Sequence, residues 1–118
     1  MPNLNAALGC AQLERLPDYV KKKRVLSKQY KSHFTQSCLA DYIDEPDLSS
    51  ANFWLNAIML PTKKDRDVFL EQTNQAGIMT RPAWKPLHLN PLFSGNNGHM
   101  PNTMAIANSL VNIPSSAV

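Results

Sequence analysis

The segment Gly77–Pro91, GIMTRPAWKPLHLNP, concentrates the side chains best suited to chemistry. Within it lie Arg81, Trp84, Lys85 and His88. A guanidinium binds phosphate or carboxylate through two parallel hydrogen bonds, and an aromatic face stacks on a base or a sugar. The set is therefore typical of a pocket for an anionic, ring-containing ligand. An alternative interpretation is that these residues serve only the fold. In that case Trp84 fills the core, Arg81 is a surface cation and His88 is a loop histidine whose hydrogen bonds are made within the protein.

Two proline steps restrict the backbone of this segment. In Arg81-Pro82 and in Lys85-Pro86 the proline ring fixes its own φ and pushes the preceding residue toward an extended conformation. The segment therefore cannot form a helix. We expect a short strand that runs into a stiff, irregular loop, and a loop of this kind presents side chains.

Length and composition set the broad class. The 118 residues suit one domain with a modest core and are too few for a cofactor-binding domain plus a substrate domain. The sequence contains neither an apolar window long enough to span a bilayer nor the pattern of a signal peptide. We expect a soluble, cytoplasmic protein. Cys10 and Cys38 lack the spacing of zinc ligands, so we expect two reduced thiols and no metal site.

Charge is mild and uneven. Much of the net charge of +3 comes from the run Lys21–Arg24, which could seek phosphate but is more simply the solvated face of a helix. No helix-turn-helix, zinc finger or aromatic platform accompanies this run, which argues against a nucleic-acid partner. The acidic run from Leu39 to Asn52 has no base or metal partner at useful spacing, so we expect its carboxylates to be solvated.

The first third of the sequence predicts two helices. The first, capped by Asn3, carries small and apolar residues on more than one face and should be buried on most sides, which so short a chain can hardly achieve. Pro17 followed by Asp18 is typical of a helix start and predicts a second, amphipathic helix that continues to Ser37. His33 lies on its apolar stripe, and we expect it to be packed.

The remaining sequence predicts a small sheet with helices. Phe53–Leu60 reads as a central strand covered on both faces, and Thr62 with Asp65 caps a helix that Gly77 closes. The other expected elements are a strand beginning at Ile78 and Met79, a turn region over 94–99 with an exposed His99, a short helix from Pro101 and a final strand in LVNIP. The fold class is α/β, a two-layer arrangement with a helical lead-in over 1–38 and a small sheet of about three strands over 53–118, covered by helices on one side.

Several stretches in sequence order carry a family resemblance: MPNLNAALGCAQLERLPDYVKKKR, W-L-N-A-I-M-L, R-D-x-F-L-x-x-T-N-x-x-G-I, T-R-P-A-W-K-P-L-H and L-V-N-I-P-S-S. Together they resemble the C-terminal part of the DegT/StrS group of pyridoxal-phosphate-dependent sugar-nucleotide aminotransferases. The likeness covers nearly the whole chain. Within the group it is nearest to enzymes that aminate 4-keto-6-deoxy sugar nucleotides, such as perosamine synthase and the legionaminic-acid-pathway aminotransferase.

The resemblance implies a larger enzyme. Members of the group have an aspartate-aminotransferase-like large domain, in which a lysine upstream of this region binds pyridoxal phosphate (PLP). No family lysine motif and no Gly-rich phosphate cradle occur in this sequence. Met1 corresponds to an internal methionine that follows an Asn-Tyr-Arg in the family, so we expect a fragment without the PLP-binding domain or bound PLP. Asn3 and Asn5 lie near that phosphate motif, although a helix cap explains both better.

The resemblance also assigns roles within the loop. Arg81 would meet the diphosphate or a sugar hydroxyl of the nucleotide-sugar substrate, Trp84 would wall the pocket, and His88 would hydrogen-bond the substrate. The first helix would pack on the absent domain and near the partner in a homodimer. With glutamate as the usual amino donor, the product would serve surface-polysaccharide synthesis, and the isolated chain should have no transaminase activity. The alternative is a free-standing oligomerisation or binding module that uses its exposed first helix.

Overall fold

A small antiparallel sheet forms the centre of the computed structural model, which describes residues 2–93 and 98–117. Its strands, in the spatial order β1-β2-β4-β3, are β1 (Asp41–Tyr42), β2 (Asn56–Met59), β4 (Leu110–Ile113) and β3 (Arg81–Pro82). The central pair, β2 and β4, places Ile58 opposite Val111. The predicted fold class is confirmed, with β1 added to the expected strands.

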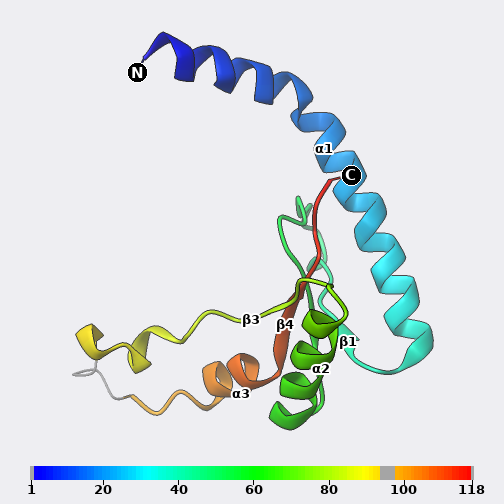
Figure 1. Ribbon diagram of the computed structural model, residues 1–118, viewed down its shortest axis with the longest axis vertical. Coiled ribbons are helices and arrows are strands. Elements are labelled where there is room, and N and C mark those ends of the chain that lie inside the picture. Colours follow the sequence, from blue (N-terminus) through cyan, green and yellow to red (C-terminus); the bar gives the residue numbers. More distant parts are fainter. Residues whose placement is uncertain (1, 94–97, 118) are drawn as a thin grey trace.

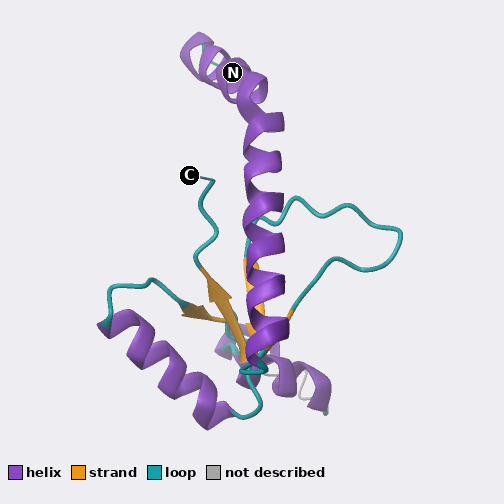
Figure 2. Cartoon of the chain, turned by 90° about the vertical axis from the view of Figure 1, so that its right-hand side faces the viewer, coloured by secondary structure: helices purple, strands orange, loops and turns teal. Residues whose placement is uncertain are grey.

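The described residues also form three α-helices, α1 (Asn3–Ser37), α2 (Lys63–Gln75) and α3 (Pro101–Ser109). Two single 3₁₀ turns, η1 (Leu87–Leu89) and η2 (Pro91–Phe93), lie between β3 and α3. Figure 1 shows that α1 runs past the sheet and far beyond it, while the segment after β3 extends away on the other side. Figure 2 shows the length of α1 standing in front of the strands.

The prediction of two N-terminal helices was wrong, because α1 is one continuous helix with Pro17 inside it. Proline lacks the N–H that would bond the carbonyl of Leu13, and its ring crowds that carbonyl, so a helix bends rather than stops when its other bonds persist. Figure 1 shows α1 curving along its blue N-terminal part. Asn3 is the first helical residue, and Pro2 occupies the cap position without a side-chain hydrogen bond.

The hydrophobic core lies between the central strands and two helices. Alternating residues of β2 and β4 are buried, with Ile58 and Val111 fully inaccessible to solvent. From α1 comes buried Phe34, and from α2 the half-buried Phe69 packs against the same cluster. The intervening residues of β2 are only half-buried, so the prediction of a strand covered on both faces was wrong within this chain.

The ends of α2 follow the sequence signals. The Thr62 hydroxyl accepts the Asp65 backbone N–H at 3.2 Å, which confirms the predicted cap. At the other end Gly77 has φ of +77°, and the N–H groups of Gly77 and Ile78 donate to the Asn74 and Thr73 carbonyls. This Schellman arrangement needs the left-handed conformation that glycine adopts most easily. Gly77 therefore closes the helix as predicted.

The remaining predictions of elements and of exposed residues were confirmed in some cases and wrong in others. The Pro101 helix and the LVNIP strand are confirmed as α3 and β4, whereas the strand expected at Ile78 and Met79 begins at Arg81. His33 is exposed and contacts the Phe34 ring edge-on, so it is not packed. Of the predicted turn region, 94–97 lie outside the described residues, and His99 is exposed as expected. Cys10 and Cys38 are exposed, free thiols.

Candidate functional site

The loop that carries the predicted site residues starts from a fixed point at Thr80. Thr80 is buried, and its hydroxyl lies 2.6 Å from the Thr73 hydroxyl on α2. The Asn74 side-chain amide donates to the hydroxyl and to the carbonyl of Thr80, at 3.0 and 3.2 Å. Because both partners belong to the last turn of α2, the chain leaves that helix in one defined direction.

Arg81 is placed by the sheet. It is paired with Asn112 of β4, which is in turn paired with Ala57 of β2. Paired residues share a face and neighbours along a strand alternate, so Arg81 lies on the face opposite buried Val111. Arg81 is exposed, and its guanidinium lies 3.6 Å from the Met79 sulfur. Among the described residues no carboxylate pairs with Arg81, so its guanidinium is open to an anion.

Trp84 does not fill the core. Its ring stacks on Trp54, from the segment before β2, with centroids 6.3 Å apart and planes inclined by 25°. The two residues are 71% and 67% exposed. Sequence reasoning missed Trp54, because nothing in its spacing links it to a loop thirty residues later.

His88 lies in η1 and is half-buried. Backbone bonds from Leu89 to the Pro86 carbonyl and from Asn90 to the Leu87 carbonyl form this turn. The predicted irregular loop therefore contains a regular turn at this point, because a proline is tolerated at the start of a short turn. Within the described residues, no hydrogen bond or ring contact joins His88 to Arg81 or Trp84.

Lys23 of α1 fixes the backbone on which Trp54 stands. Its ammonium donates to the carbonyls of Phe53 and Trp54, at 3.4 and 3.1 Å, and to the Ser115 carbonyl. The Trp54 N–H donates to the Asn52 side chain at 3.0 Å. Lys23 was predicted to belong to a solvated face, and that prediction was wrong because the 39–54 connector returns over α1.

The next residue of the basic run, Arg24, holds the same connector. Its guanidinium donates to both Glu45 carboxylate oxygens, at 2.7 and 3.2 Å, and to the Ala51 carbonyl. Lys21 and Lys22 are exposed as predicted. The basic run is therefore divided between a structural pair and a solvated pair.

The connector carboxylates are paired as well. A hydrogen bond from Lys31 lowers the pKa of Asp44 below its ordinary value. The Ala51 backbone N–H donates to Glu45 at 2.7 Å, and this bond, followed by the Arg24 pair, lowers the pKa of Glu45. The prediction of solvated carboxylates was wrong for both, because their partners lie 13 and 21 residues earlier in the chain.

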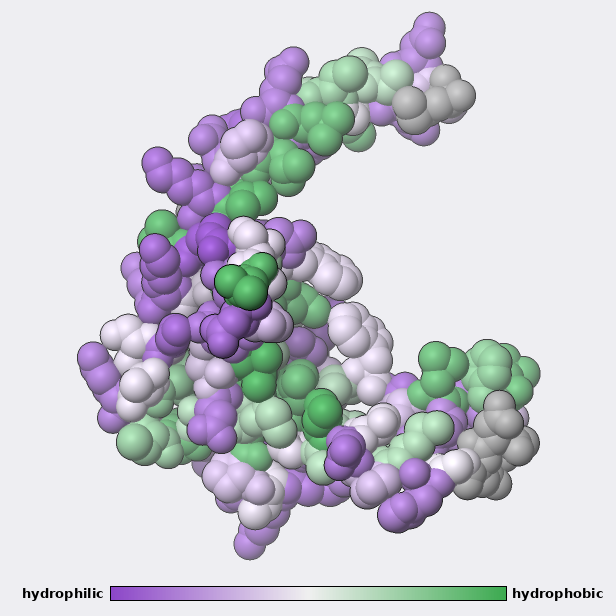
Figure 3. Space-filling view, turned by 180° about the vertical axis from the view of Figure 1, so that it is seen from behind, coloured by the Kyte–Doolittle hydropathy of each residue, from purple (hydrophilic) through white to green (hydrophobic). Residues whose placement is uncertain are grey.

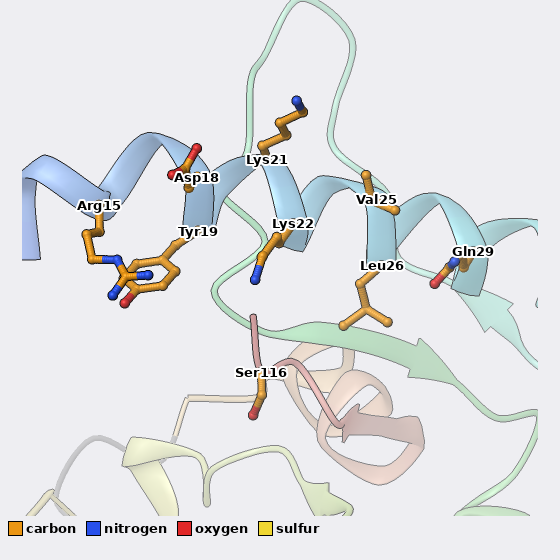
Figure 4. Close-up of a pocket in the computed structure, with 9 residues that line it drawn as sticks. All are labelled: Arg15, Asp18, Tyr19, Lys21, Lys22, Val25, Leu26, Gln29 and Ser116. Carbon is orange, nitrogen blue, oxygen red and sulfur yellow. The ribbon is translucent and has the colours of Figure 1, made fainter. Parts of the chain in front are cut away.

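A surface hollow of about 530 Å³ lies between α1 and the C-terminal segment. Figure 4 shows Arg15 beside the Tyr19 ring, and Lys22 directed toward Ser116 below the helix. The Arg15 guanidinium lies 5.8 Å from the centroid of that ring, a cation–π distance. None of the three predicted site residues lines this hollow. An adjacent, more apolar hollow of about 490 Å³ is lined in part by Trp54.

Two apolar surfaces are left uncovered on the described chain. One is the N-terminal half of α1, where Leu4, Leu8 and Leu13 are exposed, and the other follows β3, where Leu92 is exposed. Figure 3 shows the molecule curved around an open space, with hydrophobic residues along the edge of α1 that borders this space. Surfaces of this kind are uncommon on isolated domains and indicate contact with further protein or ligand.

The described lysines do not fit a PLP site. The cofactor needs a desolvated amine opposite its aldehyde, yet every lysine except Lys23 is exposed, and Lys23 donates to three carbonyls. Lys31 and Lys63 are paired with aspartates. Among the described residues no group of three or more histidine, cysteine or acidic side chains could hold a metal ion. No helix in the described part of the chain is long and apolar enough to cross a membrane.

The arrangement of a long helix before a small antiparallel sheet, with a cationic and aromatic loop at the sheet edge, is shared with solved sugar aminotransferases. The chain belongs to the DegT/DnrJ/EryC1/StrS aminotransferase family, whose model matches residues 1–117. The predicted family is therefore confirmed.

Known relatives support this assignment. GDP-perosamine synthase of Escherichia coli O157:H7 is 28% identical over 115 residues, which cover 98% of this chain and 31% of that enzyme. The structure of AtS13 from Actinomadura melliaura matches with a TM-score of 0.88 at 20% identity, over 99% of this chain and 31% of that one. Spr1654 of Streptococcus pneumoniae, solved in a PLP form, matches with a TM-score of 0.86 at 20% identity, over 98% and 31%. The chain thus spans about a third of the length of these relatives.

Proposed function

We propose that this chain is the C-terminal domain of a PLP-dependent aminotransferase acting on a 4-keto-6-deoxy sugar nucleotide. In this proposal residues 1–38 are the helical lead-in, 53–118 form the small sheet with its helices, and the PLP-binding domain is outside these 118 residues. The amino donor is glutamate, and the product serves surface-polysaccharide synthesis in the cytoplasm. The family match over residues 1–117 carries the proposal, together with the likeness to GDP-perosamine synthase.

Within such an enzyme the chain contributes substrate contacts. Arg81, exposed and without a carboxylate partner, binds the diphosphate of the nucleotide sugar. Trp84 forms a wall of the pocket, and half-buried His88 exchanges a hydrogen bond with a sugar hydroxyl. PLP, bound elsewhere in the enzyme, supplies the electron sink for amino transfer.

The exposed leucines of α1 support a homodimer in this proposal. Leu4, Leu8 and Leu13 pack on the PLP-binding domain and beside the partner subunit. The cost of leaving them in water is thereby removed in the assembled enzyme. The isolated chain, which lacks a suitable lysine, has no transaminase activity.

The test uses the complete translation product of the gene that encodes these residues. This protein is incubated with PLP, glutamate and a 4-keto-6-deoxy sugar nucleotide, and 2-oxoglutarate is measured. We expect formation that depends on the sugar nucleotide, and a loss of at least about tenfold in kcat/KM for Arg81→Ala. The absence of sugar-dependent 2-oxoglutarate would refute the proposal, as would turnover by the 118-residue chain alone.

The exposed helix also favours a second candidate, a free-standing oligomerisation module. In that case the 118-residue chain pairs with itself through Leu4 and Leu8. Light scattering after size exclusion separates the candidates, since Leu8→Glu should then convert a dimer into a monomer. A wild-type chain that is monomeric at high concentration contradicts this second candidate.

A further inference from the structure

We infer that Trp54 and Trp84 together form the stacking surface for the nucleobase of the nucleotide sugar. This assignment rests on the proposed function, and it adds Trp54 to the binding site. The two indoles are brought together from segments on opposite sides of α2 in the sequence. Their exposure of 67% and 71% leaves aromatic surface available to a third ring.

The geometry suits a flat ligand. Planes inclined by 25° and centroids 6.3 Å apart describe an offset stack rather than a perpendicular contact. In such a stack each indole covers part of one face of the other, and the outer aromatic surface of the pair stays open to a third ring. Every nucleobase has a π-face that stacks on such a surface, with little dependence on which base it is.

Backbone hydrogen bonds fix the positions of both residues of this aromatic platform, Trp54 and Trp84. The backbone of Trp54 is bonded on both sides, by the Asn52 side chain at its N–H and by Lys23 at its carbonyl, 3.0 and 3.1 Å away. The preceding residue, Phe53, has φ of +47°, a left-handed conformation that a bulky residue adopts only when its surroundings impose it. Ala83, before Trp84, donates its N–H to the Leu110 carbonyl at 3.3 Å. A backbone fixed in this way reduces the ordering cost of binding.

The positive charge near Trp84 favours a ligand whose aromatic ring is joined to an anionic group. The sequence from Gln72 to Val118 contains no aspartate or glutamate, whereas Arg81 and Lys85 flank Trp84. A cationic ring would be repelled here, and an uncharged ring would leave both cations without a partner. A nucleoside diphosphate supplies the base for the indoles and the anion for the arginine.

Intrinsic fluorescence provides a direct test, because these are the only two tryptophans of the chain. The 118-residue protein is titrated with GDP, UDP and dTDP, and with inorganic pyrophosphate as an anion without a base. We expect saturable quenching by all three nucleotides and none by pyrophosphate. Trp54→Leu should weaken nucleotide binding by about tenfold, followed through Trp84, while Trp54→Phe should stay within about threefold of the wild type.

A matched control is Phe93→Leu, which removes an exposed ring from the same extended segment but away from the platform. Its nucleotide affinity should equal that of the wild type. Far-UV circular dichroism checks that each variant is folded, and the aromatic Trp54→Phe variant keeps the test decisive if Trp54→Leu unfolds.

The assignment would be overturned by an absence of quenching by nucleotides, by equal quenching by pyrophosphate, or by unchanged affinity in Trp54→Leu. A concentration-dependent dimer that Trp54→Leu dissociates would also overturn it, because a second copy would then occupy the platform.

In the complete translation product, Trp54→Leu should raise the KM for the sugar nucleotide more than it lowers kcat. A normal KM with intact transamination refutes only the role of Trp54, whereas absent transamination beside intact nucleotide quenching refutes only the proposed enzyme.

Discussion

The two halves of α1 belong to one helix but have opposite environments. In the C-terminal half, Ser27 and Phe34 are buried against the sheet, and the Tyr30 hydroxyl donates to the Pro114 carbonyl at 3.1 Å. In the N-terminal half, Leu4 and Leu8 are 81% and 60% exposed. The difference shows which contacts this chain makes for itself and which surface it presents to something else.

The sheet and the segment after β3 repeat this contrast. Ile58 and Val111 are fully buried, whereas Leu92 and Phe93 of the extended segment are exposed. Figure 1 shows that both uncovered regions project away from the sheet, one at each end of the curved molecule. A small core of the described residues therefore carries two apolar extensions that it does not cover, and uncovered surfaces of this kind mark contact sites.

The largest expected effect comes from comparing two alanine substitutions, one in the core and one on the exposed half of α1. Ile58→Ala removes a fully buried side chain beside Val111 and should lower the free energy of unfolding by about 3 kcal/mol. Leu8→Ala removes a mostly exposed side chain and should change it by less than about 0.5 kcal/mol. Urea denaturation followed by circular dichroism measures both. Equal losses would mean that the N-terminal half of α1 is packed in solution.

A buried polar network distinguishes the two faces of the sheet. Asn56, only 1% exposed, accepts the Tyr42 hydroxyl at 2.7 Å and donates to the Ser115 hydroxyl at 3.2 Å. Asn56→Ala removes the hydrogen bonds to both partners in a buried site and should therefore lower the free energy of unfolding by about 2 kcal/mol. Asn112→Ala, on the other face, loses one long bond of 3.4 Å to Pro82 and should cost about 0.5 kcal/mol. Comparable losses from the two variants would contradict the assignment of faces.

Local signals predicted the parts of the fold that depend on neighbouring residues. Thr62 and Gly77 bound α2 as expected, since a cap and a left-handed glycine are short-range features. The failures at Pro17 and at β1 have a different cause. A helix can continue through a proline with a bend when its other backbone bonds persist, and β1 is a strand of two residues that exists because Tyr42 pairs with Ile58.

The candidate site shows the same limit. The loop with Arg81, Trp84 and His88 was found from composition and family resemblance, and its roles in binding remain predictions. Trp54 and Lys23 could not be found this way, because their contacts join segments that are about 30 residues apart in the chain. Such contacts depend on how the 39–54 connector folds back over α1, which no local pattern specifies.

The third prediction compares adjacent lysines of the basic run. Lys23→Met removes an ammonium that donates to three carbonyls and should lower the unfolding free energy by about 1.5 kcal/mol. Lys22→Met removes an exposed ammonium and should have an effect below about 0.5 kcal/mol. Thermal or urea unfolding measures both, and tryptophan fluorescence should shift only in Lys23→Met. An unchanged Lys23→Met protein would show that the connector does not need this clamp.

The smallest expected effect is on the pH dependence of stability, which should depend on a carboxylate of the 39–54 connector but not on one on the exposed face of α2. The backbone bond from Ala51 and the Arg24 pair hold the pKa of Glu45 below its ordinary value of 4.5. A carboxyl with a lowered folded-state pKa stabilises the protein above its unfolded pKa and loses this contribution as pH falls through the folded value. The loss of unfolding free energy between about pH 7 and about pH 3 should therefore be smaller in Glu45→Gln than in the wild type. Glu71→Gln is the control, because in the described part of the chain Glu71 accepts a neutral amide from Gln75 at 3.2 Å and has no cation within ion-pair distance; this variant should keep the wild-type dependence. If Glu45→Gln loses as much stability on acidification as the wild type, the Arg24 pair does not hold the connector in solution.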